Sequence, residues 1–347
     1  MPDHDSAPAV SYVMPVLNEA GYLEAAVRSI LAQRYPGELE LVLALGPSTD
    51  GTRDIAARLM AEDPRIRSVE NPGVDIPTGL NRAIAASSHP IVIRVDAHTE
   101  IPPEYTARGV ATLEREGVAT VGGSMIAVGR SGIQLAVARA YNSRFGLGGG
   151  AYHGGRAVAG PAESAYLGIF RRDVLDAVGG YDESLRRGED WELNYRIRQG
   201  GGVVWLDPAL RVSYWPRDTM GKLVRQFYAT GVWRGELVRR LGSRNSLRYF
   251  APPALLLGAI ATLVLGILVA AGVRPLPVVA LLIALGLALV AYLGLLGVAM
   301  ARSDGSLGER LRFGAVIVAM HLSWGAGFLV GVLRGARDAV DTSRTES

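Results

Sequence analysis

The chain contains no cysteine, and Lys222 is the only lysine among its 36 basic residues. The absence of cysteine excludes disulfide bonds, thiolate nucleophiles and zinc sites built on thiolates. The preference for arginine, together with 43 glycines in 347 residues, indicates a bacterial protein from a GC-rich genome. The first ten residues lack the basic and apolar regions of a signal peptide, so we expect the domain that follows to be cytoplasmic.

Charged residues are also missing from three long stretches near the C-terminus. Residues 251–273, 275–301 and 313–333 contain no Asp, Glu, Lys or Arg. A helix needs roughly 20 apolar residues to cross a bilayer, so each stretch is predicted to form a membrane helix. We therefore expect a membrane domain at residues 249–347 with about three transmembrane helices. This predicts a multi-pass protein of the bacterial plasma membrane and excludes a purely soluble enzyme.

The third apolar stretch is less uniform than the other two, because it contains His321, Ser323 and Trp324. The sequence leaves open whether this helix faces its neighbours or lies partly in the membrane interface. It also leaves the side of the C-terminus open. Three spans after a cytoplasmic domain predict an external end, whereas arginines near that end favour the cytoplasmic side. These arginines are Arg334, Arg337 and Arg344.

Positive charge is concentrated just before the first apolar stretch. Residues 217–248 hold eight basic and two acidic residues, interspersed with aromatic and aliphatic ones. This composition is typical of an amphipathic segment in the membrane interface, with arginines near anionic lipid headgroups. A basic surface helix packed on the preceding domain is the alternative. No nucleic-acid-binding motif accompanies the charge, so we expect no nucleic-acid partner.

Residues 1–216 are predicted to form one domain with an α/β fold. Short apolar runs there alternate with amphipathic stretches of about ten residues, which is typical of βαβ units and a mostly parallel sheet. Polar residues follow three of the runs, and parallel strands bring such positions to one edge of the sheet, where nucleotides bind. The predicted strands are residues 11–16, 39–45, 66–69 and 91–95, and the predicted helices are residues 20–33, 52–62 and 78–87.

Asp96 and His98 directly follow the fourth predicted strand. A carboxylate and an imidazole at this spacing can hold a divalent cation that bridges a diphosphate. The alternative is that Asp96 only caps a turn. Residues 48–52 and 189–192 are ambiguous in the same way, because each set is either the ordinary start of a helix or a group of polar side chains facing the crevice.

Taken in order along the chain, these motifs resemble the inverting glycosyltransferases of family 2, whose catalytic domain has the Rossmann-like GT-A fold. The similarity covers roughly residues 10–240. The sequence around Asp96 is most similar to the ExoA-like subgroup, named for succinoglycan biosynthesis, which also has C-terminal membrane helices. The matching segments are residues 14–19, 47–52, 79–83, 94–98, 179–183 and 189–190.

The resemblance implies a role for each matching residue. Asp190 corresponds to the catalytic base of the family. Asp96 and His98 correspond to the Asp-X-Asp motif, which binds the donor diphosphate and a divalent metal, Mg²⁺ or Mn²⁺. The positions that the family implies for binding the nucleotide-sugar are Pro15, Glu19, Asp50 and Asp96.

One position departs from the family pattern. Family members usually carry an aspartate after the second strand that contacts the nucleobase, whereas residues 43–48 contain no carboxylate before Asp50. We expect a UDP-linked donor, but this motif does not specify the base. The acids around Asp190 are all present, which argues for a working catalyst.

We predict an inverting glycosyltransferase that moves a sugar from a nucleotide-sugar to a lipid-linked saccharide or polysaccharide acceptor in cell-surface polysaccharide biosynthesis, with membrane lipids as a further partner. The alternatives are transfer to a polyprenyl phosphate, which needs no base, and a non-catalytic nucleotide-sugar-binding membrane subunit. A glycine-rich segment at residues 145–160 is either a lid over the acceptor or an ordinary surface loop. The residues expected on the acceptor side are Glu189, Trp191, Tyr152, His153 and Trp233.

Overall fold

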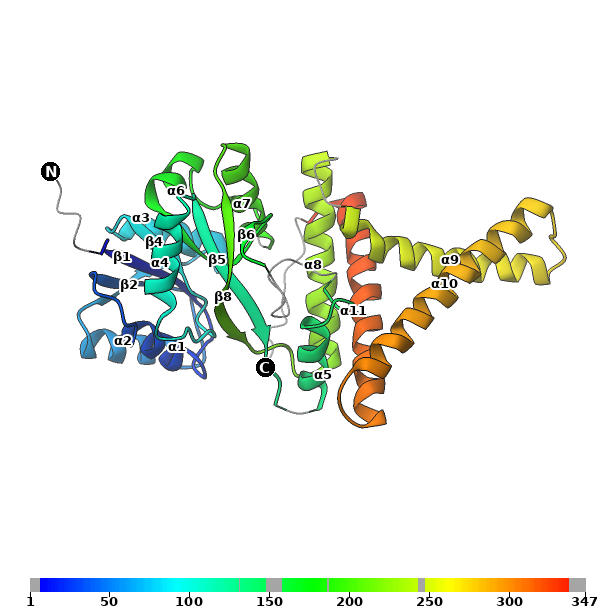
Figure 1. Cartoon of the computed structure of the whole chain (residues 1–347), viewed down its shortest axis with the longest axis horizontal. Helices are drawn as coiled ribbons and strands as arrows, with labels where there is room; N and C mark the ends of the chain where they lie inside the picture. Colours follow the sequence, from blue (N-terminus) through cyan, green and yellow to red (C-terminus); the bar gives the residue numbers. More distant parts are fainter. Residues whose placement is uncertain (1–6, 131, 148–157, 186, 243–246, 337–347) are drawn as a thin grey trace. The chain divides into compact units, whose positions relative to one another are not determined.

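The chain divides into two compact units (Figure 1). The first comprises Met1–Ala127 and Gly150–Trp215, and the second comprises Val128–Gly149 and Pro216–Ser347. Residues Val128–Gly149, which include the first part of the glycine-rich segment, therefore belong to the same unit as the C-terminal helices. The computed structural model describes residues 7–130, 132–147, 158–185, 187–242 and 247–336.

The first unit is built on an eight-stranded sheet of order β3-β2-β1-β4-β7-β5-β8-β6. β1 pairs in parallel with β2 and β4, and β2 pairs in parallel with β3, as the alternation of strands and helices predicts. β7 lies between β4 and β5 and runs antiparallel to both, so the sheet is mixed. The strands are β1 (Val10–Val16), β2 (Leu39–Leu45), β3 (Ile66–Glu70), β4 (Ile91–Arg94), β5 (Thr120–Ala127), β6 (Gly160–Pro161), β7 (Tyr166–Arg171) and β8 (Val204–Tyr214).

Helices cover both faces of this sheet. α1, α2 and α4 bury apolar side chains against one face, and α3, α6 and α7 bury theirs against the other. These layers form the Rossmann-like GT-A architecture that the sequence predicted. The sequence missed α4, since Thr106, Gly109 and Thr112 fill much of its buried face and weaken its apolar periodicity. The helices are α1 (Leu23–Leu31), α2 (Thr52–Glu62), α3 (Ile76–Ala86), α4 (Tyr105–Arg115), α6 (Arg172–Val178) and α7 (Glu189–Gln199).

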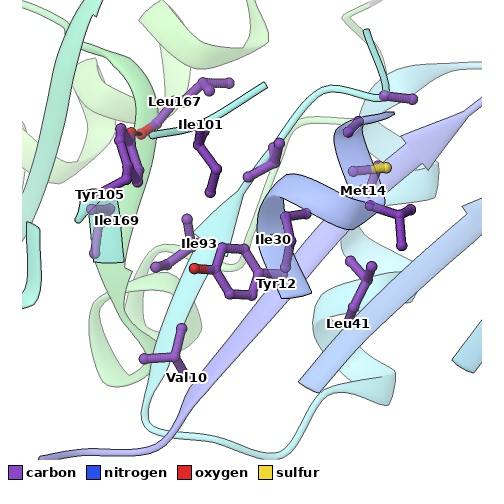
Figure 2. Packing of buried hydrophobic residues seen from close by; sticks show 14 of the residues in the cluster. Val10, Tyr12, Met14, Ile30, Leu41, Ile93, Ile101, Tyr105, Leu167 and Ile169 are labelled. Carbon is purple, nitrogen blue, oxygen red and sulfur yellow. Dashed lines mark hydrogen bonds between the residues drawn. The ribbon is translucent and has the colours of Figure 1, made fainter. Parts of the chain in front are cut away.

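The core of the first unit holds the central strands in register. Along β1, Tyr12 and Met14 pack in the cluster on one face of the sheet, and Val13 packs in the cluster on the other. All three are almost completely buried, as expected for a strand covered on both faces. Figure 2 shows Tyr12 close to Ile30 of α1 and Ile93 of β4. This packing holds β1 beside β4, and the loops of the candidate site follow these two strands.

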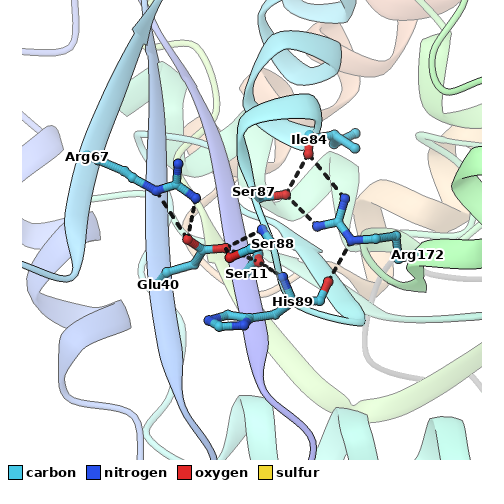
Figure 3. Close-up of polar contacts among 8 residues, drawn as sticks. All are labelled: Ser11, Glu40, Arg67, Ile84, Ser87, Ser88, His89 and Arg172. Atoms are coloured by element: carbon cyan, nitrogen blue, oxygen red, sulfur yellow. Dashed lines mark hydrogen bonds and ion pairs between the residues drawn. The ribbon is translucent and has the colours of Figure 1, made fainter.

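A polar network lies where β1 and β2 begin, at the end of these strands opposite their carboxyl ends (Figure 3). Glu40 accepts hydrogen bonds from the Ser11 hydroxyl and from the backbone N–H of Ser88, the latter at 2.7 Å. It also forms an ion pair with Arg67 of β3. Although partial burial acts to raise it, these hydrogen bonds lower the pKa of Glu40 to about 2. The carboxylate is therefore charged at neutral pH and ties three neighbouring strands to the segment before β4.

Every regular element described in the second unit is a helix. Three of them, α9 with its preceding turn, α10 and α11, are long and apolar enough to cross a membrane. They coincide with the three uncharged stretches of the sequence, and α8 carries most of the basic segment that precedes them. The elements are α5 (Gly132–Tyr141), α8 (Met220–Leu241), the 3₁₀ turn η2 (Leu247–Phe250), α9 (Ala251–Ala270), α10 (Leu276–Arg302) and α11 (Leu307–Arg334).

Candidate active site

The candidate site lies in the first unit, where the strand order of the sheet reverses. β2 and β3 lie on one side of β1, and β4 lies on the other. At such a switch point the connections after neighbouring strands diverge, which leaves a crevice at the strands' carboxyl ends. Pro15 lies one residue before the end of β1, and Asn18 and Glu19 follow that strand. Asp96 and His98 follow β4.

Glu19 and His98 join the two connections across the switch point. Nδ1 of His98 lies 3.1 Å from Oε1 of Glu19, and only 12 % of each side chain is exposed. The His98 ring also meets the ring of Tyr214, at the end of β8, edge to face with 6.4 Å between centroids. The sequence predicted Glu19 for the nucleotide and His98 for the metal, and the structure adds that the two side chains touch.

Asp50 ties the loop after β2 to the loop after β1. One of its carboxylate oxygens accepts a hydrogen bond from the N–H of Ala20 at 3.1 Å, and the other accepts from the N–H of Thr52 at 3.2 Å. The Thr52 hydroxyl oxygen in turn accepts from the N–H of Glu19 at 2.8 Å. Although slight burial acts to raise it, hydrogen bonds from the Thr52 hydroxyl and from the N–H groups of Ala20 and Thr52 lower the pKa of Asp50. Asp50 therefore shapes the loop that carries Glu19, and its contact with the nucleotide-sugar stays a prediction.

A buried arginine connects Asp96 with the start of α7. Arg94 is the last residue of β4, and only 5 % of its side chain is exposed. Its Nε donates to Oδ1 of Asp96 at 3.1 Å, and its Nη2 donates to Oε1 of Glu189 at 3.2 Å. Its Nη1 contacts the carboxylate of Asp190. One guanidinium thus holds three carboxylates from two distant segments of the chain.

Sequence reasoning assigned no role to Arg94, although a signal was present. The strand Ile91–Arg94 is buried along its whole length, and a charge there needs anionic partners because an unpaired buried charge is very costly. The identity of those partners could not be read locally, since Glu189 lies 95 residues further along the chain.

The surroundings shift the pKa values of both partners in the contact between Arg94 and Asp190. Burial acts to lower the pKa of Arg94, but the charges of Asp190 and Asp96 outweigh it and hold this pKa well above its ordinary value. Partial burial raises the pKa of Asp190 to about 7, with Arg94 opposing the effect and Glu189 adding to it. A carboxylate with a pKa near the working pH suits general-base catalysis. Because 37 % of the Asp190 side chain is exposed, a substrate hydroxyl can reach it.

The first turn of α7 carries Glu189 and Asp190, the two acids that contact Arg94. Gly188, the residue before the helix, has a left-handed backbone with φ of 78°, which glycine adopts without strain. The acids of the first turn also lie favourably at the positive end of the helix dipole. Residues 189–192 therefore begin a helix, as one interpretation of the sequence has it, and Glu189 and Asp190 also contact Arg94. A role of these acids in the crevice stays a prediction.

The remaining residues expected on the acceptor side are spread over the chain. Trp191 is 7 % exposed and stacks on Tyr195, with 5.6 Å between ring centroids. Trp233 is buried in α8, which belongs to the second unit. Tyr152 and His153 lie outside the described residues. Contact of these residues with an acceptor stays a prediction.

The donor set at the end of β4 fits a metal that binds together with a diphosphate. Among the described residues, no group of three or more His, Cys, Asp or Glu side chains lies close enough to hold a metal ion. Asp96 and His98 supply one oxygen and one nitrogen ligand, which both Mg²⁺ and Mn²⁺ accept. Mg²⁺ in nucleotide sites commonly takes one or two protein ligands and completes its shell with phosphate oxygens and water.

Comparison with known proteins gives a consistent set of matches. A family model described as Glycosyl transferase family 2 matches residues 11–179. The chain is 37 % identical over 325 residues to the succinoglycan biosynthesis protein ExoA of Rhizobium meliloti (strain 1021), covering 91 % of this chain and 92 % of ExoA. It is 22 % identical over 268 residues to a protein of Methanococcus voltae, covering 75 % of this chain and 83 % of that protein. That protein is named dolichyl N-acetyl-alpha-D-glucosaminyl phosphate 3-beta-D-2,3-diacetamido-2,3-dideoxy-beta-D-glucuronosyltransferase.

Among solved structures, the fold is similar to that of the mannosyltransferase PcManGT from Pyrobaculum calidifontis in complex with GDP-Man and Mn²⁺. The TM-score is 0.60 at 22 % identity, and the match covers 95 % of this chain and 90 % of PcManGT. At this level of identity the likeness is one of fold.

Proposed function

The chain belongs to glycosyl transferase family 2, and from this membership we propose that it moves a sugar from a nucleotide-sugar to a lipid-linked saccharide in cell-surface polysaccharide biosynthesis. The names of two relatives support this function. ExoA is named for succinoglycan biosynthesis, and the relative from Methanococcus voltae is named for transfer to a dolichyl-phosphate-linked sugar. The observation that carries the proposal is the Arg94 cluster, because it joins Asp96, on the donor side, to a candidate base at Asp190.

On the donor side we assign the nucleotide-sugar, with UDP as the expected nucleotide, to Pro15, Glu19, Asp50 and Asp96. Asp96 and His98 would hold Mg²⁺ or Mn²⁺ together with the diphosphate of the donor. When bound, such an ion stabilises the negative charge that develops on the leaving diphosphate. PcManGT, solved with both GDP-Man and Mn²⁺, is an example of a protein that binds the two together.

On the acceptor side Asp190 takes the proton of the acceptor hydroxyl as that oxygen attacks the anomeric carbon. The bond to the acceptor forms as the bond to the diphosphate breaks, and the diphosphate leaves from the opposite face of the sugar. A single displacement inverts the anomeric carbon, so an α-linked donor yields a β-linkage. Arg94 acts as a positioning residue, since it holds the Asp190 carboxylate and keeps Asp96 in place.

We assign the first unit to the cytoplasmic side of the plasma membrane, and we assign the second unit to the membrane as the anchor of the enzyme. An anchored enzyme and a lipid-linked acceptor share one surface, which raises the concentration of each near the other. The membrane anchor therefore fits an acceptor that is itself held in the membrane.

Two other functions make different demands on Asp190. In transfer to a polyprenyl phosphate the attacking oxygen is already ionised, so Asp190 would be dispensable. A nucleotide-sugar-binding subunit without activity would bind a donor and leave it intact. The contacts of Arg94 with both Asp190 and Glu189 hold the candidate base in place, which favours the base-dependent reaction.

The proposal is tested with membranes that contain the protein, a lipid extract and a panel of radiolabelled nucleotide-sugars. We expect one nucleotide-sugar to label the lipid fraction, and membranes with Asp190→Asn to leave it unlabelled. Equal labelling by Asp190→Asn would favour the polyprenyl-phosphate reaction. Donor binding without transfer or hydrolysis for every nucleotide-sugar would favour the binding subunit.

A further inference from the structure

We infer that α11 lies along the membrane surface against α8, so that only α9 and α10 cross the bilayer and the end of α11 stays on the side of α8. This arrangement is independent of the sugar that the enzyme transfers. Length and composition allow all three helices to cross. The contacts within the second unit distinguish the third helix from the other two.

α9 and α10 form a hairpin that offers its surface to lipid. In the most apolar 18-residue stretch of each helix, 6 % of α9 and 0 % of α10 is buried inside the protein, against 39 % of α11. Exposed aliphatic side chains of this density need a hydrocarbon environment. α9 begins just after Arg248 and α10 ends at Arg302. The start of α9 and the end of α10, here called the two feet of the hairpin, therefore lie at one face of the membrane.

α11 touches both feet of this hairpin. Gly314 packs against the side chain of Met300, near the end of α10, and Gly325 packs against the backbone of Pro252, in the first turn of α9. At 1.5 Å per residue, Gly325 lies about 27 Å along α11 from Leu307. A helix that entered the bilayer at Leu307 would be near the opposite face by that point. Its contact there is with the entry of α9, so α11 has remained at the first face.

Aromatic side chains support the same placement. Tyr249 and Phe250, just before α9, contact the second half of α11. Tyr249 stacks on Trp324 with 6.5 Å between ring centroids, and Phe250 meets Phe328 edge to face at 5.5 Å. Tyrosine and tryptophan gather at the level of lipid headgroups. Arg234 of α8 joins this cluster, with its guanidinium carbon 4.0 Å from the centroid of the Tyr249 ring.

α8 is fastened to the second half of α11 by glycines. A side chain at Gly231 or Gly235 of α8 would collide with the backbone of α11, and a side chain at Gly327 or Gly331 of α11 would collide with the backbone of α8. Small residues spaced four apart on each helix thus bring the two backbones into contact. Figure 1 shows α8 and α11 side by side within the second unit. Whatever depth α8 takes, this half of α11 takes as well.

Because α8 carries many charged side chains, it cannot lie at the centre of the bilayer. A charged side chain there is costly, and six of the 22 residues of α8 are charged. Arg234 lies over the Tyr249 ring, which in turn stacks on Trp324 of α11, so a charge is present beside this contact. The surface formed by α8 and α11 therefore fits the headgroup layer of a leaflet with anionic lipids. The charged residues are Lys222, Arg225, Arg234, Glu236, Arg239 and Arg240.

This placement removes the conflict between the number of apolar stretches and the arginines near the C-terminus. With two crossings, Arg302 and Arg334 lie on the same side as the first unit, as the positive-inside rule favours. With three crossings, Arg334 would lie outside.

Because the chain has no cysteine, single cysteines report the topology of the full-length protein directly. The variants are Arg274→Cys between α9 and α10, Asp304→Cys between α10 and α11, and Arg334→Cys at the end of α11. Spheroplasts are treated with a membrane-impermeant maleimide before and after permeabilisation. We expect Arg274→Cys to react in intact spheroplasts, and Asp304→Cys and Arg334→Cys to react only after permeabilisation. Reaction of Arg334→Cys in intact spheroplasts would overturn the inference.

A second measurement decides the case in which a cysteine at position 334 stays unlabelled because headgroups cover it. Green fluorescent protein fused after Ser347 fluoresces when it folds in the cytoplasm, and alkaline phosphatase fused there is active only outside. We expect a fluorescent first fusion and an inactive second one. A dark first fusion with an active second one would show that α11 crosses the membrane.

Discussion

Nη1 of Arg94 contacts the carboxylate of Asp190 across 96 positions of the chain, and Nε of the same side chain donates to Asp96 at 3.1 Å. The residue after β4 that is assigned to the donor and the residue in α7 that is assigned to the acceptor therefore share one buried cation. Removal of that cation affects both assignments, which makes Arg94 the most informative position in the site.

We expect Arg94→Met to lower kcat by about 10²-fold or more, because Asp190 loses the group that positions it. The change leaves three carboxylates without their cation, and loss of one partner of a buried ion pair costs about 3–5 kcal/mol of stability. Arg94→Lys, which keeps the charge but not the fork of donors, should recover part of kcat. The measurements are kcat, KM for the donor and thermal unfolding in detergent.

The matched control is Arg34→Met, since the Arg34 side chain is 77 % exposed and forms an ion pair with the exposed Glu104. It should change neither kcat nor stability. If Arg94→Lys is as inactive as Arg94→Met while both unfold like the wild type, Arg94 acts through more than its charge. Wild-type kcat in Arg94→Met would exclude a positioning role.

Asp190→Asn should lower kcat by about 10²–10⁴-fold, because asparagine keeps the size and helix-start character but cannot accept the proton. Donor affinity should change little, as Asp190 is assigned to the acceptor side. Turnover and donor binding are measured on the same preparation. Asp54→Asn, a change of an exposed acid in the first turn of α2, is the control and should behave as the wild type.

The dependence of kcat on pH follows from the raised pKa of Asp190, about 7. The base works in its ionised form, so the rate should fall roughly tenfold per pH unit below that value and level off above it. Arg94 opposes the shift while Glu189 and Asp96 add to it. Glu189→Gln should therefore move the acid limb to lower pH. A flat profile between pH 5 and 8 would contradict the assignment of Asp190.

Metal removal tests the pair at the end of β4. We expect chelation to abolish transfer, and Mn²⁺ or Mg²⁺ to restore it. Because the protein supplies two ligands, Mn²⁺ should bind weakly to the protein alone and more tightly when a nucleoside diphosphate is present, as followed by the electron paramagnetic resonance of Mn²⁺. Asp96→Ala and His98→Ala should weaken that binding. His89→Ala, before β4 and at the other edge of the sheet, should not.

The lowered pKa of Glu40, near the start of β2, predicts that the stability of the fold decreases in acid. Its pKa is lowered to about 2 in the folded chain from 4.5. A lowered pKa means that the carboxylate stabilises the fold above pH 4.5, and that this contribution is lost as the pH falls towards 2. Glu40→Gln should lower the free energy of unfolding at pH 7 by roughly 1–3 kcal/mol, because hydrogen bonds to a charged group are lost. The variant should therefore unfold at a lower temperature than the wild type. The difference from the wild type should shrink as the pH approaches 2.

The sequence alone determined the elements whose signals are local. Alternation of apolar runs and amphipathic stretches predicted β1 to β4 and the helices between them, because both periodicities follow from backbone geometry. Asp96, His98 and Asp190 were predicted as site residues because each stands in a short motif at the end of a strand or the start of a helix. The three uncharged stretches were evident because the thickness of a bilayer sets their minimum length.

Tertiary structure alone decided which distant groups meet. The partners of Arg94, the antiparallel insertion of β7 between β4 and β5, and the contact of Glu19 with His98 all join segments that no local pattern connects. The same holds for α11. Its composition permits a crossing, but the contacts of Gly325 with Pro252 and of Gly331 with α8 depend on how the helices pack. The hydropathy of a helix shows whether it can lie in a bilayer, whereas its packing against other helices determines where it does lie.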